Sequence, residues 1–271
     1  MGMATGRIVT LTTDFGQRDP FVGVMKGVIL GICLGATLID LTHEIAPFDI
    51  REGRDALESA WRFFPIGTIH VAVVDPGVGG RRRALALESG GHYFVGPDNG
   101  LFSFALTGDE WSAVAIEAPD YRRSEVSRTF HGRDIFAPAA GHLAAGVPLQ
   151  HLGTRITDPI QLAPPRCRRT GDEIVGEVIG TDRFGNLLTS VTADMVSELA
   201  PDGAIEVALA GRAIRGLAAS YEEGPLGVAA AIVGSGGRLE IFVKNASARA
   251  ALGAAPGAEV TVRRLGSGRR L

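Results

Sequence analysis

The N-terminal half of the chain alternates between short apolar runs and helix-like periodic segments, and this alternation constrains the fold more than any other feature. Residues 8–12, 36–41 and 69–74 form apolar runs with the composition of β-strands. Between them, residues 21–32 and 57–64 carry apolar side chains at helical spacing. The order strand, helix, strand, helix, strand predicts an α/β fold whose first domain is a mainly parallel sheet sandwiched by helices.

The pattern changes after residue 163, where proline, arginine and glycine cluster up to residue 171 and predict a linker. Beyond it the apolar runs are short and separated by glycines, which indicates a small β-barrel. We therefore expect an α/β domain over 1–163 and a β-barrel domain over 172–265. The strands expected in the second domain are 174–179, 187–191, 204–208, 238–243 and 259–262.

Composition narrows the class of protein. Hydrophobic residues make up 45% of the 271 positions, which is enough for a sizeable core. The formal charge of −3 and the absence of a basic stripe argue against a nucleic-acid partner. The apolar stretch over 28–39 is too short to cross a membrane. Two cysteines far apart, Cys33 and Cys167, form no disulfide framework, and with no secretory leader evident we expect a cytoplasmic protein.

Polar residues follow several of the predicted strands. In a parallel sheet, ligands gather beyond the carboxyl ends of the strands, which draws attention to Asp14, residues 40–44, Asp75 and residues 98–99. No G-x-G-x-x-G segment follows the first strand, and no phosphate-binding lysine loop occurs, so a dinucleotide or P-loop site is not indicated. His131 precedes a predicted helix, a position that favours a functional loop.

Six short motifs occur in a characteristic order. They read TTDFG (12–16), DPFVG (19–23), DPGVG (75–79), GPDNG (96–100), FHGRD (130–134) and DRFGN (182–186). In this order they resemble the S-adenosylmethionine hydroxide adenosyltransferases, over nearly the whole chain. That family is related to fluorinating and chlorinating enzymes that use the same substrate. The resemblance implies hydrolysis of S-adenosylmethionine to adenosine and methionine.

The resemblance also implies residue roles. Asp75, Arg82 and His131 fall where the hydrolytic family has its water-handling set. It further implies a homotrimer with sites between subunits, a small-molecule substrate and no cofactor. The residue set lacks cysteine ligands and a His-x-x-x-His pair, so we also expect no metal. The expected substrate contacts are Asp14 at the ribose hydroxyls, Phe48 beside ribose and adenine, Asp19, Asp182 and Ser235 at the methionine part, and Phe184, Asn186 and the backbone around Ala246 at the adenine.

Three other functions remain open from the sequence. The first is a halogenating transferase on the same fold, although those relatives carry a hydroxyl residue at the position of Val78, and the fluorinating branch a serine at that of Gly132. The second is a divalent-metal hydrolase built on Asp14, His43, Asp75 and His131. The third is a nucleoside-binding or sensor module without catalysis. Each isolated residue also has a plain structural role available to it, such as a turn aspartate or a solvated arginine.

Overall fold

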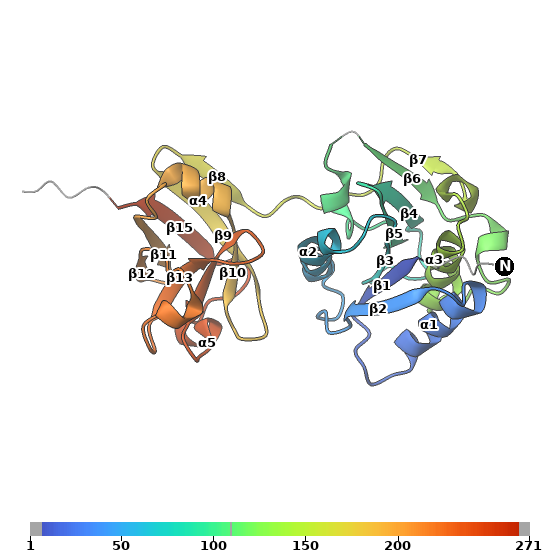
Figure 1. The fold of residues 1–271 in the computed structure, drawn as a ribbon, viewed down its shortest axis with the longest axis horizontal. Helices are drawn as coiled ribbons and strands as arrows, with labels where there is room; N and C mark the ends of the chain where they lie inside the picture. Colours follow the sequence, from blue (N-terminus) through green and yellow to red (C-terminus); the bar gives the residue numbers. More distant parts are fainter. Residues whose placement is uncertain (1–6, 109, 266–271) are drawn as a thin grey trace, which may run out of the picture. The chain divides into compact units, whose positions relative to one another are not determined.

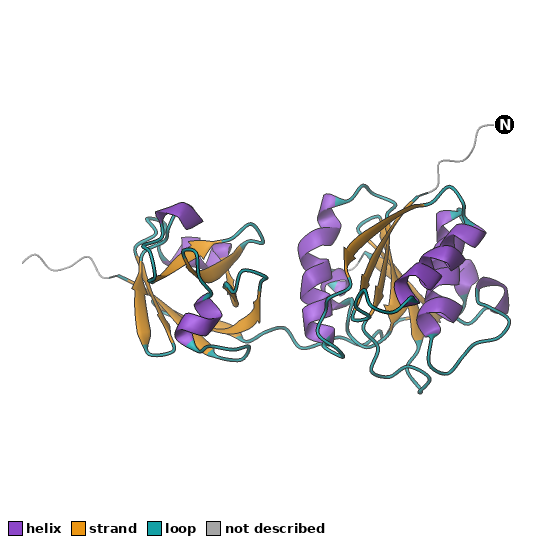
Figure 2. Cartoon of the chain, turned by 90° about the horizontal axis from the view of Figure 1, so that it is seen from below, coloured by secondary structure: helices purple, strands orange, loops and turns teal. Residues whose placement is uncertain are grey.

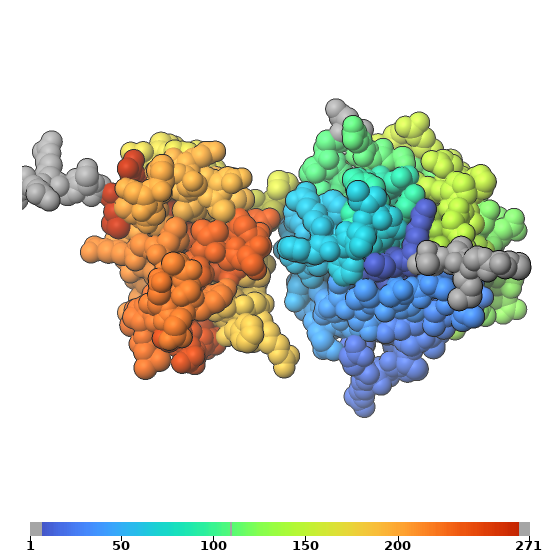
Figure 3. Space-filling view, viewed as in Figure 1, coloured from blue at the N-terminus to red at the C-terminus, as the bar shows by residue number. Residues whose placement is uncertain are grey.

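The computed structural model describes residues 7–108 and 110–265 and divides the chain into two compact units. The first unit ends at Leu162 and the second begins at Ala163 (Figure 1). Each unit is a closely packed body with a core of its own (Figure 3). The expected α/β fold followed by a barrel-like β unit is confirmed.

The first unit contains a seven-stranded sheet in the order β2-β1-β3-β5-β4-β6-β7. The neighbours β2, β1, β3 and β5 are parallel, whereas β4, β6 and β7 join antiparallel at one side. The sheet is therefore mixed, with a parallel part that carries the first three predicted strands. The strands are β1 (Ile8–Thr13), β2 (Thr37–Thr42), β3 (Ile69–Val73), β4 (Ala84–Ser89), β5 (His92–Pro97), β6 (Trp111–Ala115) and β7 (Arg155–Ile156).

Helices cover both faces of this sheet (Figure 2). Alternation along β3 explains why both faces are apolar, because Val71 and Val73 join one core cluster and Ala72 joins the other. Helices α1 (Phe21–Ile32) and α3 (Ala137–Ala144) pack in the first cluster, and α2 (Ile50–Ala60) packs in the second. A π-helical turn, η4 (Gly132–Phe136), leads directly into α3. The remaining short turns of this unit are η1 (Trp61–Phe63), η2 (Ser103–Leu106), η3 (Pro119–Tyr121) and η5 (Leu149–Leu152).

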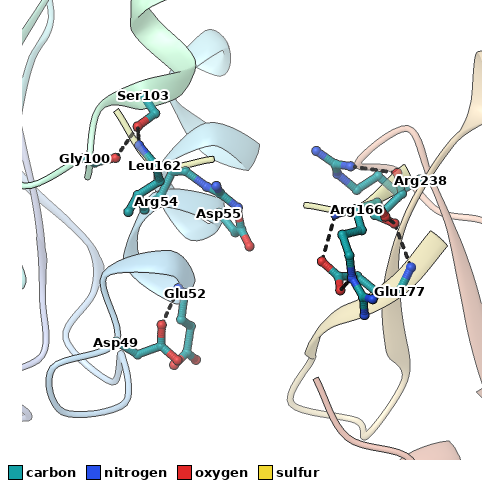
Figure 4. Close-up of polar contacts among 11 residues, drawn as sticks. Asp49, Glu52, Arg54, Asp55, Gly100, Ser103, Leu162, Arg166, Glu177 and Arg238 are labelled. Atoms are coloured by element: carbon teal, nitrogen blue, oxygen red, sulfur yellow. Dashed lines mark hydrogen bonds and ion pairs between the residues drawn. The ribbon is translucent and has the colours of Figure 1, made fainter. Parts of the chain in front are cut away.

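Helix α2 begins earlier than its apolar spacing predicts. Asp49 caps its first turn by accepting a hydrogen bond of 2.9 Å from the Glu52 amide (Figure 4). Glu52 in turn accepts from the Ala46 amide at 2.9 Å. Ile50 is the one large apolar residue of the first turn, so capping sets the helix start and apolar spacing does not reveal it.

The second unit is an almost closed antiparallel barrel with the strand order β12-β11-β15-β9-β10-β14-β13. Its seam is bridged by the Ala218 amide just after β12, which donates to the Ala231 carbonyl of β13 at 2.8 Å. The five predicted strands are present as β9, β10, β11, β14 and β15. The elements are β8 (Cys167–Thr170), β9 (Glu173–Thr181), β10 (Leu187–Thr192), α4 (Ala193–Leu199), β11 (Ile205–Leu209), β12 (Arg212–Arg215), η6 (Tyr221–Glu223), β13 (Ala229–Val233), β14 (Arg238–Val243), α5 (Ala248–Leu252) and β15 (Glu259–Arg264).

The predicted linker over 163–171 is partly ordered as a strand, because β8 occupies four of its residues and pairs with β9. On the first unit, the Leu162 amide donates to Ser103 Oγ at 2.8 Å (Figure 4). On the second, the Arg166 guanidinium pairs with Glu177 at 2.8 Å. Each end of the connection is thus bound to its own unit. Within the described residues, no helix is long and apolar enough to cross a membrane.

Two buried histidines lie within the sheet of the first unit. His70 is fully buried, hydrogen-bonds through Nδ1 with Thr10 Oγ1 at 2.8 Å, and approaches His92 Nδ1 at 3.3 Å. Its ring also stacks against Phe94, with the centroids 5.2 Å apart. Burial, reinforced by the charge of His92, lowers the pKa of His70 to about 3, and burial also lowers the pKa of His92. Both rings are therefore neutral in the folded protein near pH 7.

This pair should make the protein sensitive to acid. Below pH ~6.5 these two histidines bind protons in the unfolded chain but stay neutral in the folded chain. The free energy of unfolding therefore falls as the pH falls. For His70 alone we expect a loss of about 2 to 3 kcal/mol between pH 7 and pH 4.5. Urea unfolding at the two pH values measures it. The His70→Phe/His92→Phe double variant, which keeps the aromatic packing, should lose less stability on acidification; an equal loss would contradict the assignment.

Candidate active site

Asp75, Arg82 and His131 come together in the first unit although they are far apart in the chain. Asp75 follows the carboxyl end of β3, Arg82 precedes β4, and His131 precedes η4. Arg82 Nε donates to both Asp75 carboxylate oxygens, at 2.9 and 3.0 Å, and its Nη2 also donates to Asp75 Oδ2. The same Nη2 lies 2.7 Å from His131 Nδ1. The side chains of Asp75 and Arg82 are only 5% and 10% exposed, so the charges are well shielded from water.

A glycine turn brings Arg82 back to Asp75. The Val78 amide donates to the Asp75 carbonyl at 3.2 Å, and the Gly80 amide donates to the Gly77 carbonyl at 3.0 Å. Gly79 has a φ of +74°, and a Cβ placed on it would lie 2.1 Å from the Arg128 carbonyl oxygen. Only glycine lets this turn lie against the segment that leads to His131. The turn thus joins the two halves of the cluster.

Asp134 fixes the segment that carries His131. It is completely buried, accepts from the Ser127 amide at 2.9 Å, and forms an ion pair with Arg133 at 2.6 Å. Ser127 Oγ then accepts from the Phe130 amide at 3.0 Å. The loop is thus hydrogen-bonded from within, and His131 occupies the residue just before η4.

The contact with Arg82 decides the state of the His131 ring. A guanidinium can only donate, so His131 Nδ1 must be an unprotonated acceptor and a neutral ring carries its proton on Nε2. Burial, followed by the positive charge of Arg82, lowers the pKa of His131, while the charge of Asp75 acts in the opposite direction. A neutral His131 whose Nδ1 is already occupied is a poor proton acceptor. It orients the Arg82 guanidinium instead.

Asp14 lies next to this cluster in the sheet. It follows β1, whose last residue Thr13 pairs in register with Val73 of β3, two residues before Asp75. Asp14 Oδ2 accepts from the Phe48 amide at 2.9 Å. Phe48 has a φ of +69° and a side chain that is 70% exposed, an unusual state for an aromatic residue. Strain and exposure together are typical of a residue held for binding.

Three phenylalanines connect the segments of this site. Phe15, Phe21 and Phe130 meet edge to face, with centroid separations of 5.8, 6.1 and 5.2 Å. They flank Asp14, the exposed Asp19 and His131 respectively in the chain. The cluster therefore holds the three polar segments together by apolar contact. Sequence analysis did not single out these rings, because aromatic residues in such motifs are indistinguishable from ordinary core residues.

The remaining strand-end residues have structural roles. Asp98 is buried and accepts from Arg83 Nε at 2.7 Å and from the Ile160 amide at 2.8 Å. Asn99 Nδ2 donates to the Val74 carbonyl at 2.9 Å, and its Oδ1 accepts from the Leu101 amide at 3.2 Å. Both side chains are occupied in supporting the end of β3 and the following turn.

The second unit carries the other expected contacts. Asp182 Oδ1 accepts from the amides of Phe184 and Asn186 at 2.9 and 2.8 Å, and its Oδ2 accepts from Asn186 Nδ2 at 2.8 Å. This carboxylate thus shapes its own turn and presents Phe184, which is 78% exposed. The turn packs against the segment of Ala246, since the Gly185 carbonyl accepts from the Arg249 backbone amide at 2.9 Å. Ala246 itself is exposed.

Glu240 is a buried carboxylate that sequence analysis missed. It lies on β14 beneath the loop that holds the exposed Ser235, and a Cβ placed on Gly234 would lie 1.8 Å from its Oε1. Tyr221 donates a hydrogen bond of 2.8 Å to its Oε2. Burial first, and then the charge of Asp182, raises the pKa of Glu240. It lies in β14, where all residues over 239–243 are buried, and no sequence signal marks a buried acid there.

The structure also bears on the halide and metal alternatives. A Cβ on Gly132 would lie 3.0 Å from Met25 Sδ and 3.2 Å from Phe130 Cε2, so a serine has little room there. Among residues 7–108 and 110–265, no group of three or more His, Cys, Asp or Glu side chains is arranged to hold a metal ion. His131 Nδ1 accepts from Arg82, so this nitrogen is not available to bind a metal ion.

Comparison with known proteins identifies the family of the chain. Residues 9–153 match the SAM hydroxide adenosyltransferase N-terminal domain, and residues 176–261 match the C-terminal domain of the same family. The chain belongs to this family. A Thermus thermophilus protein named (R)-S-adenosyl-L-methionine hydrolase is 40% identical over 262 residues, which are 94% of this chain and 98% of the relative.

More distant relatives and solved structures extend the comparison. A fluorinase of an Actinoplanes species is 28% identical over 212 residues, covering 68% of this chain and 71% of the relative. The crystal structure of an uncharacterized conserved protein from Thermotoga maritima is 33% identical, with a TM-score of 0.89 over 95% of this chain and all of that one. The hydrolases are thus more similar to this chain than the fluorinase is.

The ring state of His131 can be measured directly. In ¹⁵N NMR of the wild type we expect a neutral ring protonated at Nε2, titrating below pH 6.5. Arg82→Met removes a charge that lowers the pKa of His131, so the titration should shift upward. Asp75→Asn removes a charge that raises it and should shift the titration downward. A ring protonated at Nδ1, or shifts in the reverse directions, would overturn the assignment.

Proposed function

We propose that the chain hydrolyses S-adenosyl-L-methionine to adenosine and L-methionine by in-line attack of water at C5′. The observation that carries this proposal is the Asp75–Arg82–His131 cluster, a shielded carboxylate, cation and imidazole in a chain of the SAM hydroxide adenosyltransferase family. In the substrate, C5′ bears a sulfonium whose departure gives a neutral thioether. That leaving group requires no acid, and the difficulty lies with the nucleophile.

Water is a weak nucleophile because its pKa is near 15.7. The Arg82 guanidinium supplies a fixed positive charge in a shielded place, where it stabilises the negative charge that develops as water loses its proton. Asp75 and His131 hold that guanidinium from two sides. The guanidinium is thereby oriented before the reaction begins.

Asp75 is the proposed proton acceptor. Its Oδ1 accepts one hydrogen bond, from Arg82 Nε, and so retains capacity for a water proton. His131 Nδ1 has no such capacity while it accepts from Arg82. General-base assistance of this kind contributes about 10²- to 10⁴-fold. Attack also brings a developing anion onto a cation, so shielding from bulk water favours it.

Binding at both ends of the substrate would hold C5′ in line. In this proposal Asp14 accepts from the ribose hydroxyls, since a carboxylate offers two acceptor oxygens. Phe48 lies beside the ribose and adenine, and the exposed Phe184 with Asn186 contacts the adenine together with the backbone at Ala246. The methionine part is bound by Asp19, Asp182 and Ser235. Correct positioning of this kind contributes roughly 7–11 kcal/mol to lowering a barrier.

The proposal extends to the state of the protein in the cell. It needs no cofactor and no metal, because Arg82 provides the charge that a metal ion would otherwise supply. Cys33 and Cys167 are free thiols, which supports a reducing compartment such as the cytoplasm. A small molecule is the only partner required besides further copies of the chain.

The position of the broken bond is testable with labelled water. Purified protein in ¹⁸O water should place the label in the 5′-hydroxyl of adenosine and leave methionine unlabelled, because water attacks C5′. Mass spectrometry of both products measures this. Added chloride should yield no 5′-chloro-5′-deoxyadenosine, and a chelator should leave turnover unchanged. Unlabelled adenosine, or methylthioadenosine as the main product, would refute the mechanism.

We further propose a homotrimer with sites formed between the first unit of one subunit and the second unit of the next. The division of the expected contacts between the two units supports this. Asp75→Ala and Asp182→Ala should each be inactive, and exchanged mixtures should regain activity because some sites then hold both wild-type residues. Native mass spectrometry verifies the exchange. Mixed oligomers that stay inactive would contradict a shared site.

A further inference from the structure

A buried threonine–histidine pair lies directly behind Asp14. Thr13 is fully buried and His43 is 2% exposed, and Thr13 Oγ1 lies 2.9 Å from His43 Nδ1. Thr13 Oγ1 also accepts from the Phe15 amide at 3.2 Å. This hydrogen bond bridges Asp14, which lies between the two residues in the chain. The His43 carbonyl accepts from the Gly16 amide at 2.8 Å. The turn that presents Asp14 is therefore bound to His43 at two points.

The far side of the His43 ring faces charge. Its Nε2 lies 2.9 Å from Asp40 Oδ1, and Asp40 Oδ2 accepts from Lys26 Nζ at 2.6 Å. Burial acts to raise the pKa of Asp40, but the hydrogen bond from Lys26 and the close contact with His43 outweigh it and lower that pKa, so the carboxylate is ionised. The carboxylate can only accept, so its charge 2.9 Å away favours the imidazole proton on Nε2, although the two groups are not aligned for a regular hydrogen bond.

The direction of every hydrogen bond follows from that proton. His43 Nδ1 accepts from the Thr13 hydroxyl, and the Thr13 oxygen then accepts from the Phe15 amide. The chain runs from Lys26 at the surface to the backbone on the far side of Asp14. The Thr13 hydroxyl thus holds the turn in one arrangement, by donating to His43 Nδ1 while it accepts from the Phe15 amide. Asp14 Oδ2 is separately held by the Phe48 amide.

We propose that Thr13 and His43 are positioning residues that aim the Asp14 carboxylate, and so set the selectivity of the site for an intact ribose. The inference rests on the proposed function, in which Asp14 accepts from the ribose hydroxyls. A carboxylate that rotates freely loses much of a pair of directed hydrogen bonds, because such bonds weaken steeply with misalignment. Neither side chain contacts the ligand in this proposal; both act through Asp14.

The same strand provides a matched control. Thr10, also on β1, forms an equivalent buried bond with His70 Nδ1 at 2.8 Å. Thr10 lies within the sheet, away from the Asp14 turn, and pairs in register with His70 of β3. Thr10→Val and Thr13→Val therefore remove the same chemical group from similar surroundings. Of the two variants, only Thr13→Val removes a hydroxyl that is bonded to the turn of Asp14.

The experiment compares the affinity for adenosine with that for 2′,3′-dideoxyadenosine, by calorimetry on the full-length protein. The wild type should prefer adenosine strongly. In Thr13→Val the preference should fall by about tenfold, as for loss of one charge-assisted hydrogen bond. Thr13→Ser keeps the hydroxyl and should retain the preference. Thr10→Val should lower the melting temperature without changing the ratio of the two affinities.

His43→Leu provides a second, independent test and should also lose the preference, which keeps the proposal falsifiable if Thr13→Val does not fold. Equal weakening of both ligands in Thr13→Val and His43→Leu would overturn it, as would a wild type that binds the two nucleosides equally. Failure of the proposed function is distinguishable, because the wild type would then release no adenosine from S-adenosylmethionine. Turnover with unaltered ribose preference in both variants would overturn only this inference.

Discussion

The buried guanidinium of Arg82 is the constraint on which the site depends. A cation that is 10% exposed requires an opposite charge, and Asp75 supplies it through hydrogen bonds to both oxygens. Removing one partner of such a pair costs about 3 to 5 kcal/mol, because the other charge stays buried without compensation. The third contact, to His131, follows from the same geometry. It fixes the imidazole as a neutral acceptor, which is why Asp75 is the proposed base.

The parallel part of the sheet places the polar residues of the site at one edge. Parallel neighbours end on the same side, so the residues after β1, β2 and β3 lie together there. Asp14, His43 and Asp75 each follow one of these strands. The Asp14 turn and the Asp75–Arg82–His131 cluster are therefore consequences of one topology. Glycine then permits the close approach, since Gly79 alone allows the Arg82 turn to reach the loop of His131.

The polar network is supported by apolar contact. Phe15, Phe21 and Phe130 form one cluster beside three polar residues that carry the proposed chemistry. Met25 and Phe130 close around Gly132 and leave little space for the hydroxyl that a halide site would use. In the second unit, Asp182 and the buried Glu240 shape two loops from within. Packing thus limits the space around Gly132 as well as stabilising the first unit.

The sequence alone determined the alternation of strands and helices, the division into an α/β part and a β part, and the ordered motifs that carry the family resemblance. Apolar periodicity and local turn residues are short-range properties, so they can be recognised in the sequence. Helix α2, capped by Asp49, and strand β8, rich in arginine, were missed or misplaced because polar residues form them. The choice of Asp75, Arg82 and His131 came from resemblance.

Tertiary structure decided what those residues do to one another. Which ring nitrogen of His131 carries the proton depends on an arginine 49 positions away. The roles of Thr13 and His43 depend on two strands being adjacent, and that of Asp134 on a folded loop. Hydrogen-bond direction and burial are properties of three-dimensional neighbours. A linear pattern contains the donors and acceptors, but only the fold pairs them.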